Sequence, residues 1–229
     1  MGRPPRPLIS RDRAARAALS VIDQQGLESL SLELVARKLG VKAPSLYYHF
    51  SDKAELLGEV ARLLLLDVEV SDNDRAPWED RVVNLCVATR RSILRHPNAA
   101  ILLLQFFPRH VLLAAYDRAI TSYPLAPADN LVMMEGLEKL TFGAALFEAS
   151  ARARGVEAWP PVDKTKLPAL AEALRSNKRN DDDMFVEVIR TFIAGHLRRR
   201  PALKRTATRK AARTTKPPVR GRALRRAPD

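Results

Sequence analysis

The sequence has little of what marks secreted and membrane proteins. Cys86 is the only cysteine among 229 residues, so no disulfide can form within the chain. No apolar run approaches the roughly 18 residues that a membrane-spanning helix needs. No apolar stretch follows the arginines of the first ten residues, so we expect no secretory signal. These absences predict a cytoplasmic protein with no membrane partner.

Motifs of catalysis, cofactor binding and metal binding are also missing. The chain has neither a Gly-x-Ser-x-Gly nucleophile elbow nor a glycine loop that cradles phosphates. His96, His110 and His196 stand far apart in the sequence and lack the spacing of metal ligands. We therefore expect no enzyme, no cofactor and no metal ion.

Positive charge, by contrast, is abundant and unevenly distributed. Lys and Arg number 39 against 26 Asp and Glu, for a net charge of +13. Residues 201–229 hold ten basic residues and one acid, so this segment carries +9 and leaves +4 for the rest. It contains little that could be buried, and we expect a disordered basic tail. Such a tail predicts a polyanionic partner, most often nucleic acid, with simple solubilisation as the alternative.

Apolar residues recur at helical spacing in segments that prolines and glycines separate. Ser31 and Ser51 are placed to cap two of these segments at their N-termini, and Gly26 and Gly40 to end two of them. No alternating strand pattern and no internal repeat is present, so we predict an all-α fold. The predicted helices cover residues 11–25, 32–39, 52–66, 78–96, 98–107, 109–122, 128–154, 168–176 and 182–199.

Residues 31–50, "SLELVARKLGVKAPSLYYHF", predict a helix, a glycine turn and a very short helix. Pro44 suits the first turn of the short helix, where the N–H that proline lacks would have no partner. This is the geometry of a helix-turn-helix, in which the second helix enters the major groove of DNA. Five residues are spaced to pack the two helices together: Val35, Ala36, Leu39, Val41 and Leu46.

The longer stretch "SLSLELVARKLGVKAPSLYYHFSDKAELL" resembles the N-terminal domain of the TetR family of bacterial transcriptional regulators. The motif is in register at Ala36, Gly40, Val41, Leu46, Tyr47, His49, Phe50, Lys53 and Leu56. The resemblance implies a three-helix DNA-binding domain with a helix-turn-helix, followed by a larger α-helical domain for ligand binding and dimerisation. We expect a basic disordered arm at 1–9, the DNA-binding domain at 10–57, the effector-binding and dimerisation domain at 58–200 and the basic tail at 201–229.

The resemblance also implies which side chains meet DNA. Tyr47, Lys53 and the group at Ser31 would bind phosphates, while residues that open the short helix are placed to reach base edges. Leu46 and Phe50 are expected to turn inward. Packing at a helix end is the alternative for the two tyrosines, and a helix C-terminal cap for the histidine. The expected DNA-binding residues are Ser31, Lys42, Ala43, Pro44, Ser45, Tyr47, Tyr48, His49 and Lys53.

Two positions depart from the tetracycline-repressor branch of that family. Ala43 stands where those relatives carry a long amide side chain, and Glu33 where they carry a basic residue. An alanine can contact only a thymine methyl group, and a glutamate repels phosphate or reads cytosine. We therefore expect an operator that differs from the tetracycline one. At residues 2–7, "GRPPRP", Arg3 could lie in an A·T minor groove as an AT-hook core does, or the segment is a disordered leader.

In the C-terminal domain the resemblance implies an effector pocket. Aromatic and methionine side chains stand on helices that enclose effectors in this family, with Gln105 and Glu138 as polar contacts and two histidines as anchors. Plain core burial is the alternative for each apolar residue, and an ordinary surface or core position for each histidine. The expected pocket residues are His96, Gln105, Phe106, His110, Met134, Glu138 and Phe142.

The last predicted helix carries a long apolar stripe that something must cover. Together with the later part of segment 128–154, it resembles the helix pairs that form a four-helix interface between two subunits. Burial within one subunit is the alternative. The expected interface residues are Leu146, Phe185, Val188, Ile189, Phe192 and Ile193.

The resemblance, together with the charge distribution, implies a homodimeric, ligand-responsive transcriptional regulator on the bacterial nucleoid. It would most simply be a repressor that binds a palindromic double-stranded DNA operator and is released by a small-molecule effector. The alternative is an architectural nucleoid protein whose basic tail dominates binding. An enzyme or carrier that uses an all-α pocket would explain neither segment 31–57 nor the tail.

Overall fold

The computed structural model describes residues 9–68, 75–157 and 159–198, and everything below concerns these ranges. The predictions for the N-terminal arm and the basic tail lie outside them, apart from Ile9. The all-α prediction is confirmed, since the described ranges contain helices and no strand. None of these helices is long and apolar enough to cross a bilayer. The elements are α1 (Arg11–Gln25), η1 (Leu27–Ser29), α2 (Leu32–Leu39), α3 (Ala43–Tyr47), α4 (Lys53–Leu66), α5 (Trp78–Leu94), α6 (Leu102–Gln105), α7 (Arg109–Ser122), α8 (Pro127–Arg154), α9 (Pro168–Ser176) and α10 (Asp181–Arg198).

Most helix boundaries lie within two residues of those predicted, because local signals set them. Gly26, with φ of 82°, ends α1 by donating its N–H to Ile22 O. The predicted cap at Ser51 is wrong by one residue, since Asp52 accepts the N–H of Glu55 at 2.8 Å and begins α4. The apolar segment 98–107 forms only the single turn of α6.

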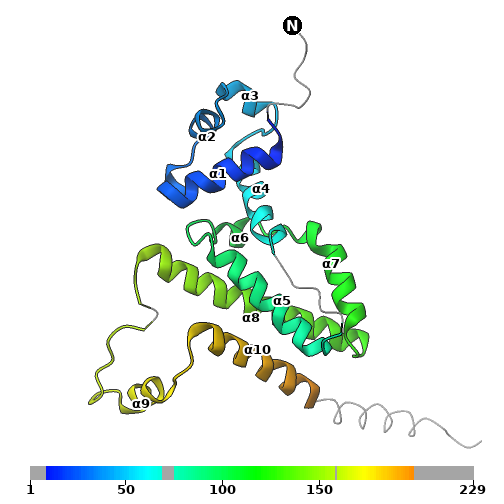
Figure 1. Ribbon diagram of the computed structural model, residues 1–229, viewed down its shortest axis with the longest axis vertical. Helices are drawn as coiled ribbons and strands as arrows, with labels where there is room; N and C mark the ends of the chain where they lie inside the picture. The colour runs from blue at the N-terminus through cyan, green and yellow to red at the C-terminus, as the bar shows by residue number, and fades with distance from the viewer. Residues whose placement is uncertain (1–8, 69–74, 158, 199–229) are drawn as a thin grey trace, which may run out of the picture.

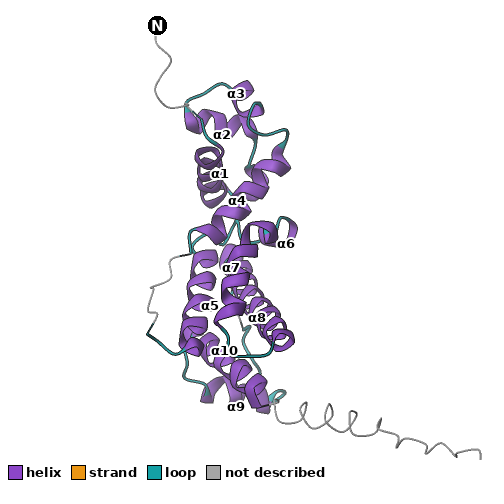
Figure 2. Cartoon of the chain, turned by 90° about the vertical axis from the view of Figure 1, so that its right-hand side faces the viewer, coloured by secondary structure: helices purple, strands orange, loops and turns teal. Residues whose placement is uncertain are grey.

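The subunit is elongated, with a small head above a larger body (Figures 1 and 2). The head consists of α1, α2 and α3, and α4 runs from it down into the body. In the body, α5 packs along α8, and α10 packs against both. α7 lies on α8, while α9 stands away from the other helices at the end of an extended loop (Figure 1).

The buried side chains form two clusters, and the division between them does not follow the predicted domain boundary. The first cluster fills the head, continues along α4 and reaches the end of α5, α6 and the second half of α8. The second joins the first half of α5 to α8 and α10. α4 therefore shares its core with both head and body, and the boundary at residues 57–58 falls inside this helix and stays a prediction.

Hydrogen bonds hold the head to the body at two places. At the end of α4, Ser92 Oγ of α5 donates to Leu64 O at 2.9 Å. At the end of α1, His96 Nδ1 lies 2.8 Å from Asp23 Oδ2, and Asn98 Nδ2 donates to Asp23 O at 3.2 Å. The end of α5 and the corner that follows it thus contact the end of α4 and the end of α1.

Candidate nucleic-acid interface and effector pocket

The helix-turn-helix is built from a capped helix and a left-handed glycine turn. Ser31 Oγ accepts the N–H of Leu34 at 3.1 Å and begins α2. Gly40 ends α2 with φ of 70°, a conformation that a side chain disfavours. The chain then reverses within two residues, and α3 begins at Ala43 with Pro44 in its first turn. These features present α3 on the outside of the head.

The large side chains of residues 46–50 point in different directions. Leu46 and Phe50 are fully buried in the head, as predicted. Tyr47 is 51% exposed and Tyr48 is 91% exposed, although aromatic rings usually contribute to a core. The backbone N–H groups of His49 and Phe50 both donate to Leu46 O, which ends the helix. The two buried residues therefore anchor α3 and leave both phenol groups facing outward.

Arg11 connects the start of α1 to the end of the recognition helix. Its guanidinium donates to His49 O, to Glu55 Oε1 at 2.6 Å and to Glu59 Oε1 at 3.2 Å. It also lies over the Phe50 ring, 4.6 Å from the centroid. Because the planar guanidinium has five donors in a fixed arrangement, one side chain can hold three chain segments in register.

Glu55 is the acidic centre of this arrangement. It accepts the backbone N–H of Ser51 at 2.7 Å and the Ser51 hydroxyl at 2.9 Å. The Ser51 backbone N–H and the Arg11 guanidinium together lower the pKa of Glu55 to about 2. The carboxylate is therefore charged at neutral pH, and the turn between α3 and α4 is held from both sides.

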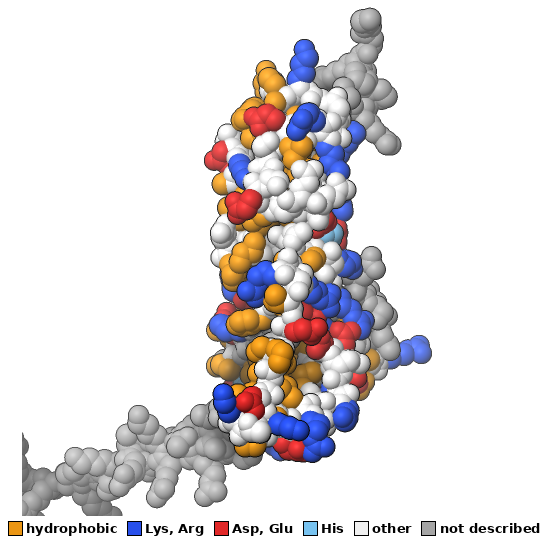
Figure 3. Space-filling model, turned by 90° about the vertical axis from the view of Figure 1, so that its left-hand side faces the viewer, with side chains coloured by type: hydrophobic (Ala, Val, Ile, Leu, Met, Phe, Trp, Pro, Cys, Tyr) orange, Lys and Arg blue, Asp and Glu red, His pale blue; other side chains and the backbone are white. Residues whose placement is uncertain are grey.

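The nine predicted DNA-binding residues lie on α3, on the turns beside it and at the starts of α2 and α4. Five of them are exposed: Lys42, Pro44, Tyr47, Tyr48 and Lys53. Ala43, Ser45 and His49 are half-buried, and so is Ser31, whose hydroxyl is engaged in capping α2. Figure 3 shows Lys and Arg side chains on the head, among acidic and hydrophobic ones. DNA contact by each residue remains a prediction.

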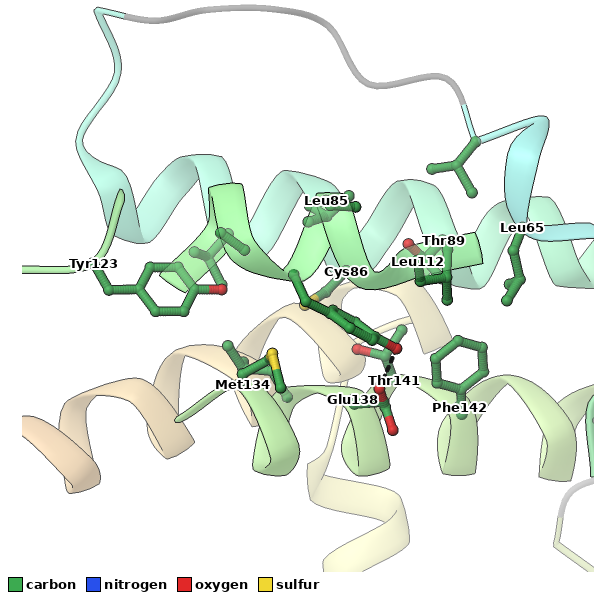
Figure 4. A pocket seen from close by; sticks show the side chains of 16 residues that line it. Leu65, Leu85, Cys86, Thr89, Leu112, Tyr123, Met134, Glu138, Thr141 and Phe142 are labelled. Atoms are coloured by element: carbon green, nitrogen blue, oxygen red, sulfur yellow. Dashed lines mark hydrogen bonds between the residues drawn. The ribbon is translucent and has the colours of Figure 1, made fainter. Parts of the chain in front are cut away.

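The body contains a cavity of about 200 Å³ between α5, α7 and α8, next to the end of α4 (Figure 4). Sixteen residues line it, and all except Thr89, Glu138 and Thr141 are aliphatic, aromatic or the thiol Cys86. Leu65 and Val68 contribute to the wall from the end of α4 and the residues just after it. A molecule bound here would touch the helix that leads to the head.

Polar groups in the wall of the cavity fall into two kinds. The carboxylate of Glu138 is engaged, since it accepts the hydroxyl of Tyr116 and the guanidinium of Arg109, both from α7. Thr141 is 3% exposed, and its hydroxyl has no hydrogen-bond partner among the described groups. It lies beside the Cys86 thiol and acts to lower the pKa of that thiol, but the two groups do not meet in hydrogen-bond geometry.

The pKa values of the surrounding groups show how apolar this region is. Burial raises the pKa of Cys86 to about 11, so its thiol stays protonated and unreactive at neutral pH. Burial likewise raises the pKa of Tyr123 to about 12. The pKa of Tyr116 is raised by burial and by its hydrogen bond to Glu138. The cavity therefore favours uncharged groups. The described residues contain no cluster of His, Cys, Asp and Glu able to hold a metal ion.

The sequence of the head matches that of a known protein family. The model for bacterial regulatory proteins of the tetR family matches residues 15–60, which span the helix-turn-helix and its supports. In these residues the chain is similar to the TetR family of bacterial regulators.

Longer matches to known proteins reach into the body as well. It is 25% identical over 197 residues to the tetracycline repressor protein class D of Escherichia coli, across 82% of this chain and 88% of that one. A transcriptional regulator of Saccharopolyspora erythraea is 31% identical over 97 residues, which is 41% of its own length. Apo ActR of Streptomyces coelicolor has a similar structure, with a TM-score of 0.66 and 25% identity over 84% of this chain and 96% of that one. ActR has also been solved in complex with actinorhodin.

The predicted effector-pocket residues agree with the lining of the cavity at only some positions. Met134, Glu138 and Phe142 of α8 line it. The other four predicted residues, His96, Gln105, Phe106 and His110, do not. His96 lies at the junction of head and body, paired with Asp23. Gln105 and Phe106 lie at and just after the short α6, and His110 is exposed at the start of α7, so these residues and His96 stand outside the lining of this cavity. Effector binding by the seven residues remains a prediction.

Residues of the cavity that the sequence did not single out come mainly from α5 and α7. Leu112, Ala115 and Ala119 of α7 and Tyr123 just after it recur at helical spacing, a signal of one apolar face. Nothing in the sequence distinguished Thr141 from other threonines, because only the packing around it leaves its hydroxyl unpartnered.

The predicted interface residues divide into two groups. Phe185, Ile189 and Ile193 are buried within the subunit against α5 and α8, so the alternative of intrachain burial describes them. Val188 is 41% exposed, on the other side of α10. Phe192 packs over Gly136 of α8, where an added Cβ would lie 2.1 Å from the ring. Leu146 is half-buried. Dimerisation through the outer faces of α8 and α10 remains a prediction.

Proposed function

We propose that this protein is a ligand-responsive repressor that binds a palindromic operator as a homodimer and is released by a small-molecule effector. It would act without catalysis and without a cofactor, in the cytoplasm on the nucleoid. The observation that carries the proposal is the recognition helix: Tyr47 and Tyr48 face outward over the buried anchors Leu46 and Phe50, on a head that continues through α4 to a cavity.

Symmetry supports a palindromic operator. Two subunits related by a two-fold axis would place their α3 helices in successive major grooves, about 34–36 Å apart. The exposed apolar residues on the outer faces of α8 and α10, Phe147, Met184 and Val188, support these helices as the contact between subunits. Figure 3 displays hydrophobic side chains exposed on the body.

The route from effector to operator would run through α4. Leu65 and Val68 touch the cavity, while Glu55 and Glu59 of the same helix hold Arg11 and, through it, the end of α3. An effector that shifts the lower end of α4 would change the distance between the two recognition helices. A 100-fold weakening of operator binding requires a coupling free energy of about 2.7 kcal/mol, within the usual range for allostery. The actinorhodin complex of ActR supports a ligand site in this family's fold.

Binding to DNA from the protein's own upstream region tests the proposal. The full chain, a chain ending at residue 200, Tyr47→Ala and Tyr47→Phe are titrated against each fragment with excess non-specific DNA. We expect the chain that ends at residue 200 to select one palindromic fragment. Tyr47→Ala should lose at least tenfold in affinity for that fragment, and the affinity of Tyr47→Phe shows how much of this loss is due to the hydroxyl group. If all fragments bind equally and only the tail matters, the protein is an architectural one instead.

A further inference from the structure

The residues that line the cavity between α5, α7 and α8 indicate which kind of molecule could bind there. Most of its wall is hydrocarbon, so most of a bound molecule must be apolar to recover the free energy of desolvation. The wall offers two polar places on α8, Glu138 and Thr141, one turn apart and facing the same space (Figure 4). These two places differ in what they can still bind.

The negative charge of Glu138 is already paired with other groups of the protein. Its side chain is 13% exposed, Arg109 neutralises it from outside the cavity, and Tyr116 donates to its second oxygen. No other ionisable side chain except the protonated Cys86 and the tyrosines lines the cavity. A cationic or anionic ligand would therefore leave water without finding a free counter-ion, which is unfavourable in an apolar site.

Thr141 has unused hydrogen-bonding capacity. A buried hydroxyl without a partner destabilises the folded protein, and native structures rarely retain one without a reason. Its oxygen can accept one hydrogen bond while its proton donates another. An isosteric valine would fill the same space without this cost. The hydroxyl is thus suited to a hydrogen bond with a bound molecule.

We propose that the cavity binds an uncharged, largely apolar molecule that presents one hydroxyl or carbonyl group to Thr141. The inference deepens the proposed effector site and rests on it only for the consequence on DNA binding. Thr141 would act as the specificity-determining residue, separating hydroxylated or carbonyl compounds from plain hydrocarbons of the same shape.

A series of probes on one scaffold tests the proposal with the full chain. Naphthalene, 2-naphthol, 2-naphthoate and 2-naphthylmethylammonium have one ring system and differ in a single group, and equilibrium dialysis at pH 7 measures each affinity. We expect 2-naphthol to bind about tenfold more tightly than naphthalene, as one good hydrogen bond allows. We expect both charged probes to bind at least tenfold more weakly than 2-naphthol.

Thr141→Val locates the effect, and Thr89→Val is its matched control in the same wall. In Thr141→Val the advantage of 2-naphthol over naphthalene should disappear while naphthalene affinity stays unchanged. Thr89→Val should keep the advantage. Because valine removes an unpartnered hydroxyl, Thr141→Val should also raise the unliganded Tm by about 2–4 °C, which checks that the variant folds.

Three outcomes would overturn the proposal: a charged probe binding most tightly, an advantage of 2-naphthol that survives in Thr141→Val, or no measurable binding of any probe. Operator selectivity, measured on the same preparations, separates this proposal from the wider one. Selective operator binding without probe binding would leave the regulator standing and remove the ligand class. Probe binding through Thr141 without operator selectivity would support the ligand class and remove the proposed regulator.

Discussion

The helices of the head and those around the cavity differ in how firmly their ends and side chains are held. In the head, Ser10, Ser31 and Asp52 cap α1, α2 and α4 with side-chain hydrogen bonds, and among the α-helices there only the short α3 begins without one. In the body, α5 to α9 begin without such a cap, and α7 and α9 contain no fully buried residue. Segments with fewer buried contacts open more readily. A rigid reading surface is thus joined to a sensor whose wall can adapt.

The largest expected effect compares one aromatic ring from each region. Phe50→Ala should lower the free energy of unfolding by about 3–5 kcal/mol, because Phe50 is fully buried in a closely packed head. Phe142→Ala should cost only about 1–2 kcal/mol, because the half-buried Phe142 already borders a cavity. Urea unfolding followed by circular dichroism measures both.

Tyr48→Ala serves as the control for these two variants. Tyr48 is 91% exposed, so its removal should leave the unfolding free energy within about 0.5 kcal/mol of the wild type. Equal losses in Phe50→Ala and Phe142→Ala would show that head and body do not differ in packing.

The next effect concerns how the recognition helix is positioned. Arg11→Met should weaken selective operator binding about tenfold, since it removes the donors to His49 O and Glu55 and leaves two carboxylates facing each other. Fluorescence anisotropy with operator and random DNA measures the ratio of the two affinities.

Arg16→Met is the matched control, with the same change of charge on the same helix. Arg16 pairs with Asp12 and Asp67, away from α3, and should leave the affinity ratio unchanged. Arg11→Lys should recover only part of the selectivity, because an ammonium cannot hold several segments in one plane. Equal losses in both Met variants would mean that charge alone matters.

The smallest effect is the dependence of stability on pH, which the two regions should show at opposite ends of the scale. Glu55 in the head has a folded pKa of about 2, below its ordinary value. Its contribution to stability is present above the unfolded pKa of about 4.3 and is lost as the pH falls through 2. Tyr123 in the body has a folded pKa of about 12. Its contribution is present below the unfolded pKa of about 10 and is lost as the pH rises toward 12.

Single variants assign the two limbs of the pH profile. Glu55→Gln should flatten the acid limb and leave the alkaline limb unchanged, and Tyr123→Phe should do the opposite. Chemical unfolding at a series of pH values gives both limbs. A Glu55→Gln profile that matches the wild type on the acid side would contradict the assignment to the head.

Local patterns made the head predictable. The N-cap at Ser31, the glycine turn at Gly40 and the inward Leu46 and Phe50 follow from residues within one or two helical turns of each other. Where two hydrogen-bond acceptors adjoin, as at Ser51 and Asp52, the sequence alone could not tell which begins the helix. The side chain of Arg11 was not singled out, because its partners are 38 to 48 residues away.

The cavity was less predictable, because its wall comes from four separate segments. The sequence by itself determined that the chain is helical, where most helices begin and end, and which turn presents the recognition helix. Only the tertiary structure decided that Phe185, Ile189 and Ile193 are covered within one subunit, that His96 belongs to a junction, and that Thr141 lacks a partner. The reason is physical: helix boundaries and faces depend on neighbours along the chain, whereas burial and hydrogen bonding depend on groups that only packing brings together.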